Sequence, residues 1–250
     1  MANLKVNTVS GIGTEGPVLN GGLHFRSKNY MTLPKGNTTD AFPDFKAVPA
    51  ASARGIFAGG ISEPSPTRHN EIDFITIATT GNGQRFGDLT LARSGAASLS
   101  NSTRGLIAGG NPETNTVDFV TIQSEGNAQN FGDLLSSIQA TDGCSDLTRG
   151  VFGGGEDSPT SINTIQFLTI TTQSNATDFG DLTQARRNLA SGSSPTRGFF
   201  MGGDFQASSY NDTIDFVTIA SPGNATDFGD MTANTLRSQG CCGDSHGGLG

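Results

Sequence analysis

The sequence RGIFAGG at residues 54–60 recurs three times along the chain, as RGLIAGG at 104–110, RGVFGGG at 149–155 and RGFFMGG at 197–203. After a variable polar stretch, each copy is followed by a second fixed piece, which reads IDFITI, VDFVTI, IQFLTI and IDFVTI in turn. Each unit then closes with Phe-Gly-Asp-Leu or Phe-Gly-Asp-Met. Successive leading arginines lie 50, 45 and 48 residues apart, which identifies a tandem array. The fold must therefore be built unit by unit.

Charge divides the chain near residue 50. Of its 15 basic and 23 acidic residues, 5 and 3 lie before that point, which leaves 10 and 20 after it. A surface that is acidic overall repels phosphate, so we expect no nucleic-acid binding by the repeats. The division predicts an N-terminal anchoring segment and linker at 1–50 and a repeat domain at 51–250.

Membrane, export and redox signals are absent from the sequence. No stretch approaches 18 consecutive apolar residues, and Met1 leads into a polar run, so we expect a soluble protein without a cleaved export signal. The chain has three cysteines, Cys144, Cys241 and Cys242. They are too few for a disulfide framework, and their spacing is not that of metal ligands. We expect reduced, packed cysteines, no metal and no cofactor.

Turn signals recur every 8 to 12 residues, and uninterrupted helical stretches are almost absent, which favours an all-β fold. In the second unit we expect strands at 105–108, 117–122 and 130–134, followed by a weaker strand of small residues that ends in Cys144. The strand VDFVTI is apolar on both faces, as a strand covered on both sides would be. Near the N-terminus, Asn20-Gly21-Gly22 between two apolar pairs predicts a short hairpin in the anchoring segment.

The order of these pieces resembles the kelch repeat. The shared features are an apolar strand ending in Gly-Gly, a strand with an aromatic centre, an aromatic shortly before a Leu, and Ala-Arg ahead of the next unit, as at Ala92-Arg93 and Ala185-Arg186. Kelch repeats build β-propellers with one four-stranded blade each, so the resemblance implies a four-bladed propeller. The chain departs from the family in having Phe in place of the Trp of the last strand.

The first blade lacks a small-residue strand ahead of its first copy. The run RSQGCCG at 237–243 follows the fourth unit as RSGAASL at 93–99 follows the first, so we expect the C-terminal strand to complete the first blade and close the ring. The competing arrangement is an open half-ring that a second subunit closes.

A second resemblance covers the start of the chain. The pieces NLKVN at 3–7, GIGTEGPV at 11–18, Asn29-Tyr30 and LPKG at 33–36, attached to Phe-Gly-Asp-Leu repeats, are similar to virion structural proteins of marine cyanobacterial phages. This resemblance implies a capsid-decoration or tail-associated component, assembled in the host cytoplasm and located in the virion. Its partners would be other virion proteins and the host cell surface, and a homo-oligomer is compatible with it.

We predict structural roles for the repeated glycines and phenylalanines. The Gly pairs let a strand end at positive φ and let chains approach closely, and the alternative, a phosphate cradle, lacks the Lys of a P-loop. The pairs are Gly59 and Gly60, Gly109 and Gly110, Gly154 and Gly155, and Gly202 and Gly203. We expect the Phe residues to be buried and to hold neighbouring blades together. They are Phe74, Phe119, Phe167 and Phe216, with Phe86, Phe131, Phe179 and Phe228.

Charged residues of the repeat leave one alternative open. The Gly-Asp of the closing motif predicts a turn in which the carboxylate accepts backbone N–H bonds, at Asp88, Asp133, Asp181 and Asp230. The sequence Asp-Phe-Gly also occurs in the metal-binding motif of protein kinases, but no other kinase motif accompanies it here. The arginines bond loop carbonyls or the Asp series, or else line a channel and bind an anion. They are Arg54, Arg104, Arg149 and Arg197.

An enzyme is the class that the sequence supports least. Its three histidines and two tyrosines are too scattered for a copper site, and no Ser-His-Asp or Cys-His set is evident. We therefore predict a non-enzymatic virion component that residues 1–50 anchor. The alternative is a host-surface adhesin of a tail fibre, for which the absence of Trp leaves little surface for stacking on sugars. Any partner contact should fall on the variable loops at 61–71, 111–116, 156–164 and 204–213.

Overall fold

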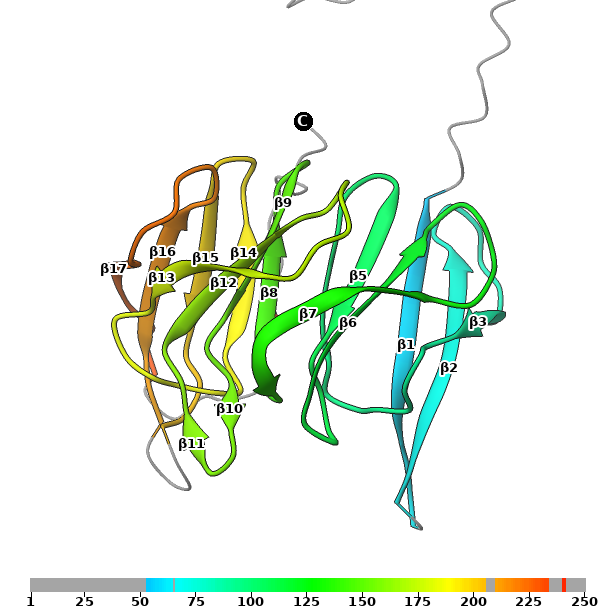
Figure 1. Ribbon diagram of the computed structural model, residues 1–250, viewed down its shortest axis with the longest axis horizontal. Helices are drawn as coiled ribbons and strands as arrows, with labels where there is room; N and C mark the ends of the chain where they lie inside the picture. The colour runs from blue at the N-terminus through cyan, green and yellow to red at the C-terminus, as the bar shows by residue number, and fades with distance from the viewer. Residues whose placement is uncertain (1–52, 65, 206–209, 234–239, 242–250) are drawn as a thin grey trace, which may run out of the picture. The chain divides into compact units, whose positions relative to one another are not determined.

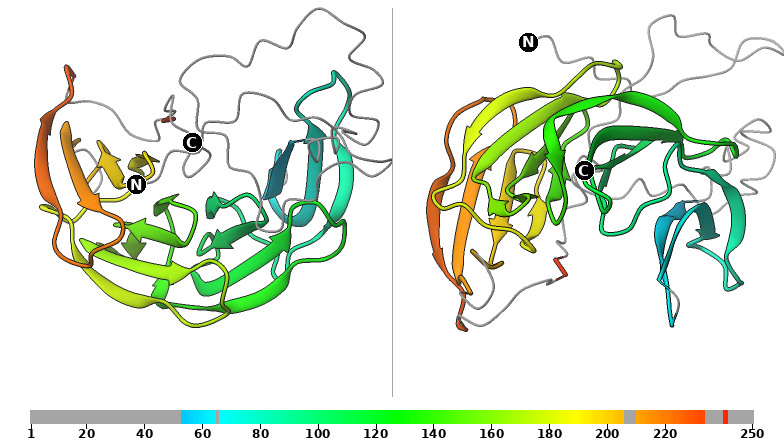
Figure 2. Two further views of the ribbon diagram at one scale, coloured as in Figure 1. Left: turned by 90° about the horizontal axis from the view of Figure 1, so that it is seen from above. Right: turned by 60° about the horizontal axis from the view of Figure 1, so that its bottom comes forward.

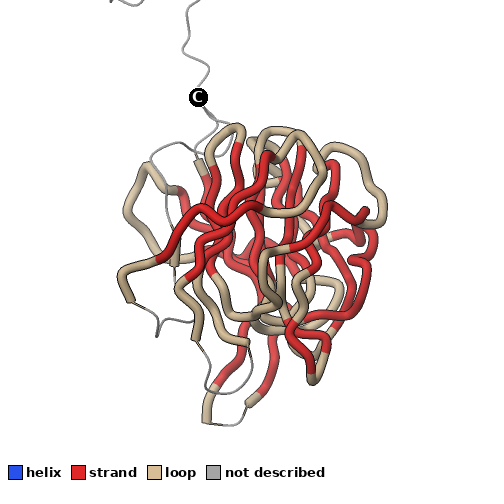
Figure 3. Tube along the Cα trace, turned by 90° about the vertical axis from the view of Figure 1, so that its left-hand side faces the viewer, coloured by secondary structure: helices blue, strands red, loops and turns tan. Residues whose placement is uncertain are grey.

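The structure is a computed structural model that describes residues 53–64, 66–205, 210–233 and 240–241. All of these belong to one compact unit, which begins at Pro49. The predicted anchoring segment with its hairpin, and most of the predicted C-terminal strand, lie outside the described residues. The described residues form 17 strands and no helix (Figures 1 and 3), as the sequence predicted.

Each copy of the repeat contributes one antiparallel sheet, and we number the sheets 1 to 4 along the chain. Sheet 1 consists of β1 (Arg54–Ser62), β2 (Thr67–Thr76) and β3 (Gln84–Asp88). Sheet 2 consists of β4 (Ala97–Ser100), β5 (Arg104–Ala108), β6 (Thr114–Thr121) and β7 (Gln129–Ile138).

Sheets 3 and 4 have the same strand order as sheet 2. Sheet 3 consists of β8 (Asp142–Ser145), β9 (Arg149–Gly153), β12 (Thr164–Thr169) and β13 (Thr177–Asp181). Sheet 4 consists of β14 (Ala190–Ser193), β15 (Arg197–Met201), β16 (Thr213–Thr218) and β17 (Thr226–Asp230). A small hairpin of β10 (Glu156–Asp157) and β11 (Thr160–Ser161) extends the loop between β9 and β12.

The small-residue strands start sheets rather than end them. β8, which contains Cys144, pairs with β9 of the following copy, and β4 and β14 pair in the same way with β5 and β15. These three strands lie side by side along the inside of the series of sheets (Figure 2). Sheet 1 has no such strand among the described residues, and a groove of about 330 Å³ lies between β1 and β4 instead.

The hydrophobic core lies between consecutive sheets. One cluster joins Ile72 and Phe86 of sheet 1 to Ile107 and Val120 of sheet 2, and two more clusters join sheet 2 to sheet 3 and sheet 3 to sheet 4. Fully burying one such side chain contributes roughly 1.5–3 kcal/mol, so each sheet is stabilised mainly by its neighbours. None of the described residues forms a helix that could span a membrane.

Candidate functional site

The repeated arginines hold neighbouring sheets together. Each guanidinium lies over the Phe ring of its own sheet, at 4.3 Å for Arg54 and at 4.7–4.9 Å for the other three. Arg54, Arg104 and Arg149 also each donate from Nη1 to an Ile carbonyl of the next sheet, over 3.0–3.1 Å. These contacts match the carbonyl-binding prediction for Arg54, Arg104 and Arg149.

The Gly pairs take the positive φ that the sequence predicted. Gly59 and Gly60 have φ values of 68° and 130°, and the other three pairs have φ values between 61° and 115°. A Cβ on Gly59 would lie 2.3 Å from the Arg93 carbonyl oxygen, and the N–H of Gly60 donates to that same oxygen over 2.9 Å. Glycine is therefore required both by the backbone conformation and by the close approach of the next connection.

The Phe pairs stack edge to face within each sheet, with ring centroids 5.8–6.0 Å apart. Phe86, Phe131 and Phe179 are buried against the following sheet, as predicted. Phe167 of the third copy is half-buried. Phe216 is half-buried and Phe228 is 55 % exposed, so the prediction of burial was wrong for the last copy. The physical reason is that, among the described residues, no sheet comes after sheet 4.

The Gly-Asp pair of the closing motif does not form a turn, which corrects the prediction. In all four sheets it lies within the outermost strand, where the register shifts at a β-bulge opposite the Phe-centred strand. Gly132, Gly180 and Gly229 take positive φ there. A bulge needs the same backbone freedom as a turn, which explains why the residue types suggested one. The backbone N–H groups of Asp88, Asp133 and Asp181 donate to Asn side chains of the next sheet.

Sequence reasoning missed two buried ion pairs between sheets. The side chains of Arg93 and Asp118 are both fully buried, with Nη2 3.1 Å from Oδ2, and Thr90 donates to the same carboxylate from its backbone N–H and from Oγ1. Arg186, Asp215 and Thr183 repeat this arrangement between sheets 3 and 4. Burial lowers the pKa of both guanidinium groups, and the paired carboxylates oppose that shift. The signal in the sequence was the Thr-x-x-Arg ahead of each following IDF or VDF piece.

The boundary between sheets 2 and 3 uses a neutral substitute. Ile138 stands where the other boundaries have Arg, and Gln166 stands where they have Asp; their exposed fractions are 0 % and 1 %. Gln166 Oε1 accepts the N–H of Leu135 over 2.8 Å, as the Asp118 carboxylate accepts that of Thr90. The two positions change together, because a buried carboxylate without a cation is costly.

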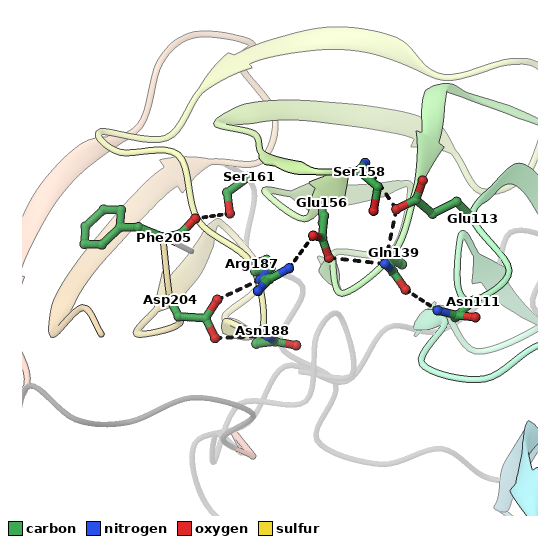
Figure 4. A network of polar contacts seen from close by, with 10 residues as sticks. All are labelled: Asn111, Glu113, Gln139, Glu156, Ser158, Ser161, Arg187, Asn188, Asp204 and Phe205. Atoms are coloured by element: carbon green, nitrogen blue, oxygen red, sulfur yellow. Dashed lines mark hydrogen bonds and ion pairs between the residues drawn. The ribbon is translucent and has the colours of Figure 1, made fainter. Parts of the chain in front are cut away.

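A second set of polar side chains forms what we call the polar belt, namely Asn111, Gln139, Glu156, Arg187 and Asp204 (Figure 4). Asn111 donates to Gln139, Gln139 donates to Glu156, and Arg187 joins Glu156 to Asp204. The hydrogen bond from Arg187 to Asp204 raises the pKa of Arg187. Backbone bridges pair Gln139 with Glu156 and Arg187 with Asp204.

Three residues of the polar belt are the first residues of variable loops. Its members Asn111, Glu156 and Asp204 each come directly after a Gly pair, and the loops from there to the Phe-centred strand all leave at one edge of the sheets, at the bottom of Figure 1. The loop predicted at 61–71 is shorter than expected, because β1 and β2 extend into it as far as Ser62 and Thr67. At this edge the loops differ from copy to copy both in side chains and in backbone, since β1 and β2 extend in the first copy and β10 and β11 form a hairpin in the third.

The chemistry of the described residues is limited. They contain no group of three or more His, Cys, Asp or Glu that could hold a metal ion. Burial raises the pKa of the Cys144 thiol to about 12, so this thiol does not form a nucleophilic thiolate near neutral pH. Cys241 is exposed, so the prediction that all cysteines are packed was wrong for this residue.

No protein-family model matches the chain, and no curated protein matches it either.

Proposed function

We propose that this protein is a non-enzymatic structural component of a phage virion, a capsid-decoration or tail-associated protein that residues 1–50 anchor. In this proposal the four sheets are blades of a kelch-like β-propeller, and the C-terminal strand at 237–243 provides the missing inner strand beside β1. The groove between β1 and β4 is where such a strand would pair with β1 and lie next to β4, as β4 lies next to β8.

One observation carries the proposal. The repeated residues make contacts between sheets. Arg donates to Ile carbonyls, Phe packs against the next sheet, and Thr donates to a buried Asp. The side chains that differ between copies gather at one edge, on loops held by the polar belt. A rigid scaffold that presents varied loops at one edge suits a projecting binding or decorating protein rather than a catalyst.

The alternative function, a host-surface adhesin, is favoured by apolar side chains at the loop edge. Tyr210 is 38 % exposed and Ile61 is 47 % exposed, and an aromatic ring in a loop can stack on a sugar. A glycan array with the isolated protein tests this alternative directly. Binding that the substitution Tyr210→Ala abolishes would favour the adhesin.

Deleting residues 2–50 tests the virion proposal. We expect the shortened protein to keep a cooperative β-sheet fold and to disappear from purified particles, whereas the full chain is located in them by cryo-electron microscopy. Unchanged incorporation of the shortened protein would reject the anchor. Absence of the full chain from particles would reject the virion role.

Grafting loops tests the role of the variable edge. Replacing 157–160 with a short Gly-Ser turn keeps Glu156, which the polar belt needs, and should leave the melting temperature nearly unchanged while any partner contact is lost. Unfolding on this replacement would instead assign the loop to the scaffold.

A further inference from the structure

Consecutive sheets meet through one set of hydrogen bonds that occurs at all three internal boundaries. The backbone N–H of Asp88, at the end of sheet 1, donates to Asn127 Oδ1 of sheet 2 over 3.1 Å, and the Asp88 carbonyl accepts the N–H of Ala128 over 2.8 Å. Asp133 with Asn175 and Ala176, and Asp181 with Asn224 and Ala225, repeat both bonds. The end of each outer strand therefore recognises an Asn-containing turn of the next sheet.

Two further contacts accompany this recognition. The Arg at the start of each of the first three RG strands reaches forward to an Ile carbonyl of the next sheet, as Arg104 does to Ile170 over 3.0 Å. At two of the three boundaries, a Thr two residues after the Asp binds a buried Asp of the next sheet, as Thr90 does to Asp118. Every boundary thus has a donor side, formed by one sheet, and an acceptor side, formed by the next.

Sheet 4 has a complete donor side that nothing in the described residues engages. Asp230 and Thr232 occupy the places of Asp88 and Thr90 and are exposed, and Arg197 lies over Phe216 without a carbonyl partner in that part of the chain. Phe228 is 55 % exposed, against 4 % for Phe86, which holds the same place in sheet 1. We define the donor end face by four of these residues: Arg197, Phe228, Asp230 and Thr232.

Sheet 1 has the matching acceptor side, and the described residues leave it unused as well. Asn82 occupies the place of Asn127, and Asp73 occupies the place of Asp118 but is exposed. Ile77 is 63 % exposed, whereas Ile170 and Ile219 in the same place are fully buried. Phe57 is 58 % exposed, against 0 % for Phe152 in the same place. We call Phe57, Asp73, Ile77 and Asn82 the acceptor end face.

Among the described residues the two end faces do not meet, so these residues do not show the ring closed within one chain that we expected from the sequence. Sheets 1 and 4 stand at opposite ends of the series (Figure 2), and among the described residues no hydrogen bond joins them. We propose that the donor end face of one chain docks on the acceptor end face of a second copy of this chain. Arg197 then donates to the Ile77 carbonyl, Asp230 N–H donates to Asn82, and Thr232 donates to Asp73.

Such a contact is head-to-tail, because each chain offers two different faces. Repeated head-to-tail contacts produce either an open filament or a closed ring. Here two curved chains close into one ring, because the donor end face of each docks on the acceptor end face of the other. Closure leaves no exposed apolar end, since Phe57, Ile77 and Phe228 are then all covered. The inference concerns self-association and does not rest on the virion role.

Two blocking variants of the full chain test the contact. A Cβ on Gly81 meets nothing within 4 Å, whereas the corresponding Gly126 carbonyl oxygen lies only 2.2 Å from where a Cβ on Gly87 would stand. Gly81→Trp should therefore leave the chain folded and block the acceptor end face. Thr232→Trp, at an exposed position, should block the donor end face.

Sedimentation velocity measures the outcome. We expect the wild-type protein at twice the 25.8 kDa chain mass, each blocking variant at the chain mass, and a dimer again when the two variants are mixed, because each supplies the face that the other lacks. Leu147→Trp, at a turn outside both end faces, is the matched control and should remain dimeric. A monomeric wild type, blocking variants that stay dimeric, or a mixture that stays monomeric would each overturn the proposal.

Circular dichroism checks that the variants fold. If either Trp variant unfolds, the same mixing experiment is done with Asn82→Ala and Arg197→Ala instead. These two substitutions remove only the atoms that make the contact. These milder variants should raise the dimer dissociation constant at least tenfold, and an unchanged constant for both would also overturn the proposal.

Discussion

Exchanging one buried ion pair for its neutral counterpart is the sharpest test of how the sheets are joined. The change is Arg93→Ile, alone and together with Asp118→Gln. The double variant gives the boundary between sheets 1 and 2 the residues that Ile138 and Gln166 provide between sheets 2 and 3. The chain therefore carries its own template for the substitution.

The magnitudes derive from the burial of both partners. Asp118 is fully buried, and without Arg93 its carboxylate keeps only the two hydrogen bonds from Thr90. Leaving one charge of a buried pair uncompensated costs about 3–5 kcal/mol. The double variant removes both charges, and Nε and Nη1 of Arg93 have no hydrogen-bond partner to lose among the described residues. We expect the double variant to lie within about 1 kcal/mol of the wild type.

Urea denaturation followed by circular dichroism measures both free energies of unfolding, and the single variant Asp118→Gln completes the double-mutant cycle. Arg85→Ile is the control, because the pair of Arg85 with Asp88 is exposed and should contribute less than about 1 kcal/mol. The reasoning is refuted if Arg93→Ile costs no more than this control, or if adding Asp118→Gln restores nothing.

Three further substitutions or measurements probe single positions. Phe131→Ala should cost about 3–5 kcal/mol by urea denaturation, whereas Phe228→Ala should cost much less, because Phe228 is 55 % exposed; equal losses would contradict the packing described above. Gly154→Ala should lower the melting temperature more than Gly95→Ala, although both glycines have φ near 60°. The reason is that a Cβ on Gly154 would lie 2.4 Å from the Arg186 carbonyl oxygen, whereas a Cβ on Gly95 would meet nothing within 4 Å. Cys144, whose pKa is raised to about 12, should resist alkylation at pH 8 in the folded protein and react after unfolding, while Cys241 reacts in both states. Because the unfolded thiol ionises near its ordinary pKa of 9.0, Cys144 should also make stability fall as pH rises above that value, which denaturation at several pH values would show.

The periodic part of the fold could be predicted from the sequence, because each repeated residue type has one physical use. Gly pairs marked strand ends at positive φ, and Phe at fixed spacing marked the strands whose rings pack between sheets. The small-residue strand was expected as the last of its unit, yet β8 pairs with the following copy. The closure prediction had already placed such a strand ahead of a copy, so the two interpretations of the sequence disagreed, and the pairing of β8 with the free edge of β9 decides between them.

The contacts between sheets were harder to predict. Arg93 and Asp118 are 25 residues apart and belong to different pieces of the repeat, Ala92-Arg93 and VDFVTI, so no single motif of the sequence pairs them. Gly-Asp suggested a turn because bulges and turns select the same residues, and only the register of the outer strand separates them. The exposure of Phe228 depends on whether a further sheet packs against sheet 4, which a single repeat cannot indicate.

The boundary between sheets 2 and 3 shows why the joints and the loops behave differently. At a joint, Arg with Asp and Ile with Gln are each complete solutions, but either mixed pair, Arg with Gln or Ile with Asp, leaves a buried charge without its partner. Substitution there must be paired, which restricts it. In the polar belt, Gln139 and Arg187 hold corresponding places and both bind the carboxylate of Glu156, one neutral and one charged, so this carboxylate accepts either kind of partner. Single substitutions are therefore tolerated at that edge and not at the joints, so the loops can acquire new contacts while the sheets keep their packing.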